Sequence, residues 1–244
     1  MVERGLAESR TRAQALVLEG NVRVAGQVEV KASRQLDETA TIEVEQPPRF
    51  VSRGGEKLEG AFALWGADAE APFDVTGKTC LDVGSSTGGF TDCLLQHGAA
   101  FVMAVDVGTN QLAYSLRRDP RVWVRENYNA RYMERADLPQ TPSVAVTDVS
   151  FISLELILPP IARVLEPGGL VVALIKPQFE VGRGNAPGGL VRDEGLRLAA
   201  RDRIVDFAVR TLGFELLGLA ESPIRGKEMG NIEYLSYWRK CIRG

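Results

Sequence analysis

The sequence predicts an α/β protein in which helices cover a mostly parallel sheet, with a smaller α+β domain in front of it. After residue 57, apolar segments typical of buried strands alternate with helical segments, and this alternation favours a parallel sheet between helices. Before residue 47, one helical segment is followed by short strands of alternating polarity, and two prolines then end the unit. A hydrophobic content of 45% over 244 residues is enough for both cores.

The small domain, residues 1–46, is predicted to contain one helix and three strands. Ser9 is a candidate N-cap and Gly20 a candidate stop for the helix between them. A hairpin turn is expected at Gly26-Gln27, because apolar and polar residues alternate on both sides of it. The three strands are expected at residues 22–24, 28–30 and 41–44.

The larger domain, residues 57–244, follows a linker at residues 47–56 and opens with a helix that ends at about residue 65. No helical segment separates its last two strands, so the final strand is expected to enter the sheet antiparallel. Its strands are expected at residues 79–83, 101–106, 122–125, 143–149, 169–175, 214–220 and 233–239. Its other helices are expected at residues 89–97, 109–118, 153–165 and 195–212.

Composition and charge exclude several classes of protein. A net charge of −3 argues against indiscriminate nucleic-acid binding, although residues 4–34 carry six basic and three acidic side chains. No apolar run is long enough to span a bilayer and no signal-peptide core is present, so we expect a cytoplasmic protein without a membrane partner. The cysteines, Cys80, Cys93 and Cys241, lack metal-ligand spacing and are expected to be reduced packing residues. The single histidine, His97, is expected at a helix C-terminus, so no metal site is predicted.

A glycine-rich loop at residues 81–92 (LDVGSSTGGFTD) is the most informative segment of the chain. It is typical of a buried strand, a turn and a helix that begins near Gly88, which would aim unpaired backbone N–H groups at a nucleotide-like ligand. Asp106, at the end of the next strand, stands where an acid can accept hydrogen bonds from ribose hydroxyls. The alternative is a tight structural turn, and the ordered strand, glycines, helix and distal acid argue against it.

S-adenosylmethionine fits this loop better than a nicotinamide dinucleotide does. A dinucleotide loop needs its second glycine for close approach of the pyrophosphate, and Ser86 occupies that position here. Asp82, in the strand before the loop, would repel a phosphate but could orient a cationic ligand. Asp106 does not discriminate, because both cofactors carry a ribose.

Two further strand ends bring charged side chains to the same edge of the predicted sheet. The fourth strand delivers Asp148, and Lys176 directly follows the fifth. A lysine after a six-residue apolar strand needs a partner, so we expect an ion pair between the two, either catalytic or purely structural. A lysine of this kind could accept the proton of a ribose hydroxyl during methyl transfer, with Lys57 as a second cation and Glu233 as a second carboxylate.

Taken in order, Lys57, Asp148, Lys176 and Glu233 match the Lys-Asp-Lys-Glu set of the FtsJ-like RNA ribose 2'-O-methyltransferases. The sequence motifs around them are residues 51–58 (VSRGGEKL), 148–153 (DVSFIS) and 176–182 (KPQFEVG). With the small domain, they resemble the TlyA family, also called hemolysin A, over essentially the whole chain. The small domain itself resembles the RNA-binding domain named after the fourth protein of the small ribosomal subunit, and it is expected to lack that domain's first helix.

The resemblance implies a class I, Rossmann-like methyltransferase that uses S-adenosylmethionine and modifies a cytidine ribose in ribosomal RNA, with ribosomal RNA or the ribosomal subunits as its partner. It implies that Lys176 is the central base-like residue, that Asp148 orients it, and that Lys57 and Glu233 complete the pocket. The residues expected at the cofactor are Asp82, Gly84, Ser85, Gly88, Gly89, Phe90, Asp106, Asn127, Asn129 and Asp148. The arginines expected on RNA phosphates are Arg10, Arg12, Arg53, Arg183 and Arg192.

The loop at residues 179–192, which contains two of these arginines, is either a lid over RNA or an ordinary surface loop. Three other functions are open at this point. An RNA- or ribosome-binding protein with a degenerate catalytic domain is one, although all four site residues are present. A cytolysin is the second, suggested by the hemolysin name alone. A nicotinamide oxidoreductase is the third, disfavoured by Ser86.

Overall fold

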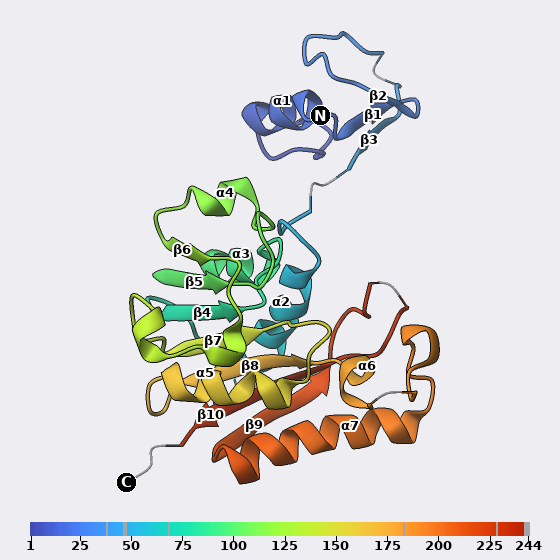
Figure 1. Cartoon of the computed structure of the whole chain (residues 1–244). Coiled ribbons are helices and arrows are strands. Elements are labelled where there is room, and N and C mark those ends of the chain that lie inside the picture. Colours follow the sequence, from blue (N-terminus) through green and yellow to red (C-terminus); the bar gives the residue numbers. More distant parts are fainter. Residues whose placement is uncertain (38, 46–47, 68, 183, 228, 242–244) are drawn as a thin grey trace. The chain divides into compact units, whose positions relative to one another are not determined.

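The computed structural model describes residues 1–37, 39–45, 48–67, 69–182, 184–227 and 229–241. It divides into two compact units, Met1–Arg49 and Phe50–Gly244 (Figure 1). The second unit therefore begins inside the segment expected to be a linker.

The first unit packs helix α1 (Arg10–Leu18) against a three-stranded sheet of order β2-β1-β3. Its strands are β1 (Val22–Val24), β2 (Gln27–Val28) and β3 (Ile42–Val44). The Ser9 side chain accepts a hydrogen bond from the Arg12 N–H and caps the helix, as predicted. Leu16, Val17 and Val22 form the centre of a small core.

The hairpin turn of this unit lies one residue earlier than the sequence predicts. Val24 pairs with Gln27, so the turn residues are Ala25 and Gly26, which both have positive φ. That backbone matches the twist of the two strands better than a turn at Gly26-Gln27 would. Strand β2 ends at Val28 rather than residue 30.

The second unit contains a seven-stranded sheet of order β6-β5-β4-β7-β8-β10-β9. Strand β10 runs antiparallel to both of its neighbours, and the other pairings are parallel, which confirms the predicted antiparallel final strand. The strands are β4 (Thr79–Val83), β5 (Phe101–Val105), β6 (Val122–Arg125), β7 (Val144–Thr147), β8 (Leu170–Ile175), β9 (Phe214–Glu221) and β10 (Tyr234–Lys240).

Helices cover both faces of this sheet (Figure 1). Residues of α2 (Gly54–Trp65), α3 (Gly89–Gln96) and α4 (Tyr114–Arg117) share one core cluster, whereas α5 (Leu158–Val164) and α7 (Glu194–Asp206) contribute to the other. The short helix α6 (Pro177–Glu180) follows β8 directly. No helix in the part of the chain that the structure describes is long and apolar enough to cross a membrane.

Three predicted helices differ from the structure. Only Tyr114–Arg117 is helical within the segment predicted at 109–118. The segment at 153–165 is a 3-10 turn (Leu154–Leu156) followed by α5, because Pro159 and Pro160 favour a helix start at that point. Helix α7 continues as a π-helical turn, Phe207–Thr211, up to Gly213. The remaining short 3-10 turns are Ala130–Tyr132, Arg135–Asp137 and Pro187–Gly189.

Candidate active site

Three neighbouring cavities open at the carboxyl ends of the parallel strands, the edge where open α/β sheets bind ligands. The loop cavity, of about 630 Å³, lies between the loops after β4, β5 and β7. The catalytic cavity, of about 350 Å³, is lined by Lys57, Lys176 and Glu233. A connecting cavity of about 170 Å³ contains Ser85 in its wall. Ser150 lines all three cavities, so they form one composite site.

Glycine is required at two turns of the glycine-rich loop. Gly84 has φ of 81°, and a Cβ there would lie 2.8 Å from the side chain of Val149. Gly88 has φ of 100° and is the N-cap of α3, where a Cβ would lie 2.3 Å from the side chain of Leu116. Any side chain at these positions would be strained and would also push on a packed neighbour.

Asp106 ties the glycine-rich loop to the loop after β5. Its Oδ2 accepts a hydrogen bond from the Ser86 N–H at 2.8 Å, and its Oδ1 accepts one from the Gly108 N–H at 2.6 Å. Each carboxylate oxygen can accept a further hydrogen bond, so Asp106 can organise the loops and still receive ribose hydroxyls. It lies in the wall of the loop cavity, where the sequence argument expects it.

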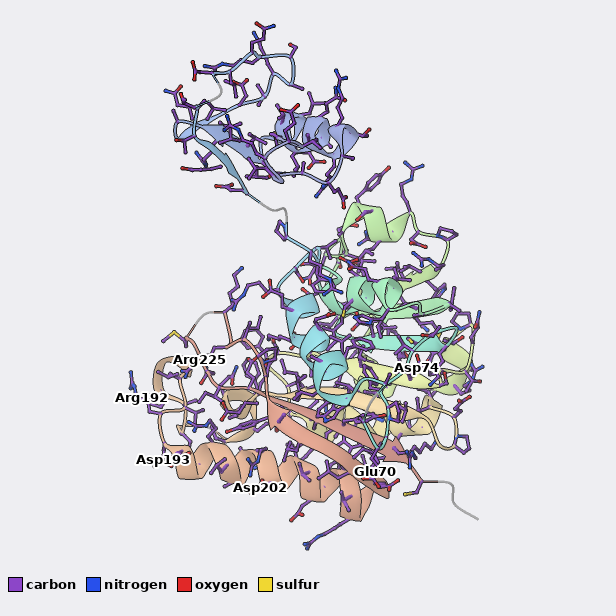
Figure 2. All side chains as sticks on the ribbon, turned by 180° about the vertical axis from the view of Figure 1, so that it is seen from behind. Glu70, Asp74, Arg192, Asp193, Asp202 and Arg225 are labelled. Carbon is purple, nitrogen blue, oxygen red and sulfur yellow. The ribbon has the colours of Figure 1, made fainter. Side chains whose placement is uncertain are left out.

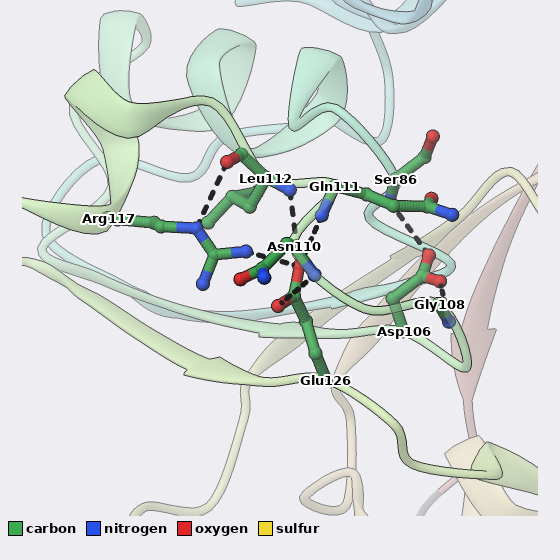
Figure 3. A network of polar contacts seen from close by, with 8 residues as sticks. All are labelled: Ser86, Asp106, Gly108, Asn110, Gln111, Leu112, Arg117 and Glu126. Carbon is green, nitrogen blue, oxygen red and sulfur yellow. Dashed lines mark hydrogen bonds and ion pairs between the residues drawn. The ribbon is translucent and has the colours of Figure 1, made fainter.

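Glu126, which directly follows β6, holds the other half of the loop after β5 (Figure 3). Its carboxylate accepts hydrogen bonds from the backbone N–H groups of Asn110, Gln111 and Leu112 at 2.8, 2.9 and 3.2 Å. The Arg117 guanidinium, 2.5 Å away, and these N–H groups lower the pKa of Glu126 to about 2. A regular helix does not begin at residue 109, because Asn110 has a left-handed φ of 55° and the Ala113 N–H donates to the Thr87 carbonyl at 3.0 Å.

Asp82 lies beneath the glycine-rich loop instead of facing the ligand edge. Its side chain is fully buried, and its Oδ2 accepts a hydrogen bond from the Thr91 hydroxyl at 2.7 Å. Burial raises the pKa of Asp82 to about 7. Its role in the structure is therefore to join β4 to α3, next to the loop.

Most of the residues predicted at the cofactor line the composite site. Those in the loop cavity are Gly84, Asp106, Asn129 and Asp148. Those in the connecting cavity are Gly84, Ser85, Gly89, Phe90 and Asp148. Three predicted residues are absent from the described linings of the three cavities, namely Asp82, Gly88 and Asn127. Asn127 instead supports the loop after β5, because its N–H donates to the Gly108 carbonyl at 2.8 Å.

A line of alternating charges, which we call the charge chain, connects Lys176, Asp148, Lys57 and Glu233. The Lys176 Nζ lies 2.7 Å from Asp148 Oδ1, as the sequence predicts. The Lys57 Nζ lies 3.6 Å from Asp148 Oδ2 and donates a hydrogen bond to Glu233 Oε2 at 2.7 Å. Both lysines and Glu233 are buried. Buried ion pairs are costly to desolvate, so three linked pairs at a ligand edge indicate a functional constellation.

Strand pairing brings the charge chain together. The parallel pairing of β7 with β8 places Asp148 and Lys176 near each other at the ends of adjacent strands. The antiparallel pairing of β10 with β8 sets Tyr234 opposite Ile175, so Glu233 enters from the same edge. Helix α2 supplies Lys57 from the face of the sheet that it covers.

Three supporting side chains were not singled out from the sequence. Ser150 Oγ accepts a hydrogen bond from Lys176 Nζ at 2.8 Å, and Gln178 Nε2 donates to Glu233 Oε1 at 3.1 Å. Glu180 accepts hydrogen bonds from the Ser153 hydroxyl at 2.6 Å and from the Leu154 N–H at 2.9 Å, and burial raises its pKa. Each lies within one of the sequence motifs at residues 148–153 and 176–182, but only the fold shows what it contacts.

The arginines predicted on RNA phosphates belong to both units. Arg10 is exposed and Arg12 is half-buried on α1 of the first unit. In the second unit, Arg53 is exposed and donates to the Arg225 carbonyl at 3.0 Å, and Arg192 is exposed just before α7 (Figure 2). Arg183 lies outside the described residues.

The fold and the site together define a Rossmann-like methyltransferase. Its sheet has the antiparallel last strand, and its glycine-rich loop opens at the carboxyl edge beside a chain of charged side chains. A model of the FtsJ-like methyltransferase family matches residues 50–240. The chain belongs to that family.

Full-length relatives agree with this assignment. Hemolysin A of Brachyspira hyodysenteriae is 45% identical over 239 residues, which cover 96% of this chain and 95% of the relative. The 16S/23S rRNA (cytidine-2'-O)-methyltransferase TlyA of Mycobacterium tuberculosis is 42% identical, and the match covers 98% of this chain and 87% of the relative. A crystal structure of a candidate hemolysin from Lactococcus lactis is 49% identical with a TM-score of 0.75, covering 80% of this chain and 90% of that one.

Proposed function

We propose that this protein transfers the methyl group of S-adenosylmethionine to the 2'-hydroxyl of a cytidine in ribosomal RNA. The observation that carries the proposal is the charge chain, which lies directly beside a cavity suited to the cofactor. Membership of the FtsJ-like family and the printed activity of the mycobacterial relative support the same reaction. A ribosomal substrate would place the enzyme in the cytoplasm.

The residues of the loop cavity fit S-adenosylmethionine. Val83, Val105 and Ile157 offer apolar wall for an adenine, and Asp106 offers acceptors for a ribose. The buried hydroxyl of Ser85 has no hydrogen-bond partner among the described residues and lies in the wall of the connecting cavity, where a polar ligand would satisfy it. When bound, the cofactor supplies an electrophilic methyl group on a sulfonium.

Lys176 would accept the proton that the ribose hydroxyl loses. Asp148 and Ser150 position the amine of Lys176 for this step. Lys57 holds the other oxygen of the Asp148 carboxylate, at 3.6 Å. Glu233 in turn anchors Lys57 at 2.7 Å. The ammonium of Lys176 formed in the reaction is then held by Asp148 and Ser150.

RNA binding is assigned to the basic side chains of both units. We infer that the first unit is the RNA-binding domain suggested by its sequence, with Arg10 and Arg12 on phosphates. Arg53, Arg183 and Arg192 are proposed to bind further phosphates of the RNA. The segment before Arg192 already has a support, because Asn231 accepts from the Val191 N–H at 3.0 Å and donates to the Gly189 carbonyl at 2.7 Å.

The decisive experiment is radiolabelled methyl transfer from S-adenosylmethionine to purified, unmodified 30S and 50S subunits. Label in RNA that is lost in Lys176→Ala and retained in Lys78→Ala would support the proposal. Lys78 is a matched control, because it lies before β4, at the opposite edge of the sheet, and donates to the Asp74 carbonyl. Cofactor binding without any label on either subunit would instead indicate a ribosome-binding protein with a degenerate catalytic domain.

A further inference from the structure

A second group of potential ligand side chains lies between α2 and α3 and has no part in the reaction proposed above. It consists of Glu59 on α2, and of Cys93 and His97 on and just after α3. Cys93 and His97 are four residues apart, so both face the same neighbour across one helical turn. The sequence does not predict the group, because Glu59 lies 34 residues before Cys93 and outside any metal-ligand spacing.

The ligand atoms of the three residues converge on one point. The Glu59 Oε2 lies 2.7 Å from His97 Nε2 and 3.8 Å from Cys93 Sγ, and all three atoms lie within 4.8 Å of one another. Two ligands on a tetrahedral zinc ion are about 3.3 to 3.6 Å apart, given Zn–N, Zn–O and Zn–S bonds of about 2.0 to 2.3 Å. Movements of about 1 Å or less would therefore bring all three atoms to bonding distance.

The surroundings favour coordination over a simple ion pair. The Phe62 ring stacks on the His97 imidazole with a centroid distance of 3.6 Å and an interplanar angle of 4°, which holds the ring with Nε2 facing Glu59. Cys93 is fully buried, whereas the side chains of Glu59 and His97 are 31% and 27% exposed, so an ion could enter from the solvent side. One thiolate, one imidazole and one carboxylate are ligands that zinc accepts together, with solvent in the fourth position.

We propose that Glu59, Cys93 and His97 form a zinc-binding site that joins α2 to α3. On binding, Cys93 releases its thiol proton to solvent and the thiolate coordinates the ion, with the imidazole and the carboxylate completing three protein ligands. Helix α2 carries Lys57 of the charge chain, and α3 begins at the glycine-rich loop. The site would thus clamp together the two helices that support the two halves of the active site.

Cobalt(II) and zinc titrations of the full chain test this site. We expect one equivalent of Co²⁺ to produce a thiolate-to-metal charge-transfer band, and one equivalent of Zn²⁺ to displace it. The band should vanish in Cys93→Ser, and the affinity for zinc should fall at least tenfold in His97→Gln and Glu59→Gln. Zinc should also raise the melting temperature of the unmodified protein and leave that of Cys93→Ser unchanged.

Cys241→Ser is the matched control, because Cys241 is exposed and is the thiol most accessible to adventitious metal. It should bind cobalt and zinc as the unmodified chain does. The proposal fails if the unmodified chain shows no thiolate band, or if the band disappears in Cys241→Ser and persists in Cys93→Ser. His97→Gln guards against misfolding of the buried cysteine variant, because its side chain is partly exposed and its loss leaves the core thiol in place.

Discussion

The loop cavity and the charge chain lie side by side, yet they are built from different kinds of contact. Around the loop cavity, Asp106 and Glu126 accept hydrogen bonds from backbone N–H groups, so these carboxylates shape the loops. In the charge chain, side chains contact side chains, and the backbone enters only through strand pairing. The comparison implies that removing a charge at the loop cavity should weaken cofactor binding. Removing a charge in the charge chain should instead slow methyl transfer.

Glu233→Gln should give the largest effect. The change keeps the shape of the side chain but removes the closest counter-charge of Lys57, 2.7 Å away. Lys57 would then interact more strongly with Asp148, and the contact between Asp148 and Lys176 would weaken. We expect the rate of methyl transfer to fall by about 10³-fold, with the affinity for S-adenosylmethionine nearly unchanged. Single-turnover kinetics and calorimetric cofactor binding separate the two. A large loss of affinity at an unchanged rate would contradict the division between the two sides.

Asp82→Asn should change how stability depends on pH. Burial raises the pKa of Asp82 from 3.8 to about 7 in the folded chain. Its contribution to stability is therefore fully present below about pH 4 and is lost as the pH rises to about 7, a difference on the order of 3 kcal/mol. The variant cannot titrate, so its unfolding free energy should vary less with pH across this range. Urea unfolding across it tests this, and parallel curves for the two proteins would refute it.

Glu126→Gln should weaken cofactor binding by about tenfold, because a neutral amide accepts the three backbone N–H groups and Arg117 more weakly than a carboxylate does. The rate of transfer at saturating cofactor should change little. Calorimetry with S-adenosylmethionine measures the first quantity and single-turnover labelling the second. Equal losses in both would mean that the loop after β5 also acts on the chemistry.

Glu180→Gln should give the smallest effect, about a threefold loss of transfer rate. Glu180 is a carboxylate that holds a backbone N–H, that of Leu154, but it does so on the catalytic side and supports the loop that follows Asp148. The amide oxygen of glutamine can accept the same two hydrogen bonds, from the Ser153 hydroxyl and the Leu154 N–H, so an amide mimics the carboxylate well. A loss comparable to that of Glu233→Gln would show that loop position on this side matters as much as charge.

Local patterns predicted most of the sheet, because β4 to β10 are apolar segments between turn signals and each lies within about two residues of its expected position. The difference at residues 109–118 has a long-range component, since the Ala113 N–H donates to the Thr87 carbonyl of the glycine-rich loop and Asn110 adopts a positive φ. No periodicity within the segment indicates either feature. The small hairpin differs by one residue for a local reason, since Val24 pairs with Gln27 and leaves Ala25 and Gly26 in the turn.

The candidate site was predictable to the extent that strand ends determine it. Asp148 and Lys176 follow from two adjacent strands, and their contact is confirmed at 2.7 Å. Lys57 and Glu233 were candidates as a second cation and a second carboxylate, but only the family resemblance assigned them to the pocket, because no local pattern indicates that a helix and the last strand meet there. The Glu59, Cys93 and His97 group was missed for the same reason. Cys241 was predicted to be a packing residue, which is wrong, because it is exposed at the end of β10.

Because β10 is antiparallel to β8, the register of this strand pair determines whether Glu233 reaches Lys57. Tyr234 pairs with Ile175 on one side and with Glu221 on the other, and the bulge at Tyr237 and Trp238 affects only the pairing with β9. A slip of one residue along β8 would turn Glu233 away from Lys57 and exchange the two faces of the strand. A single residue inserted inside β10 would therefore disturb the contact between Glu233 and Lys57 even if the sheet still formed.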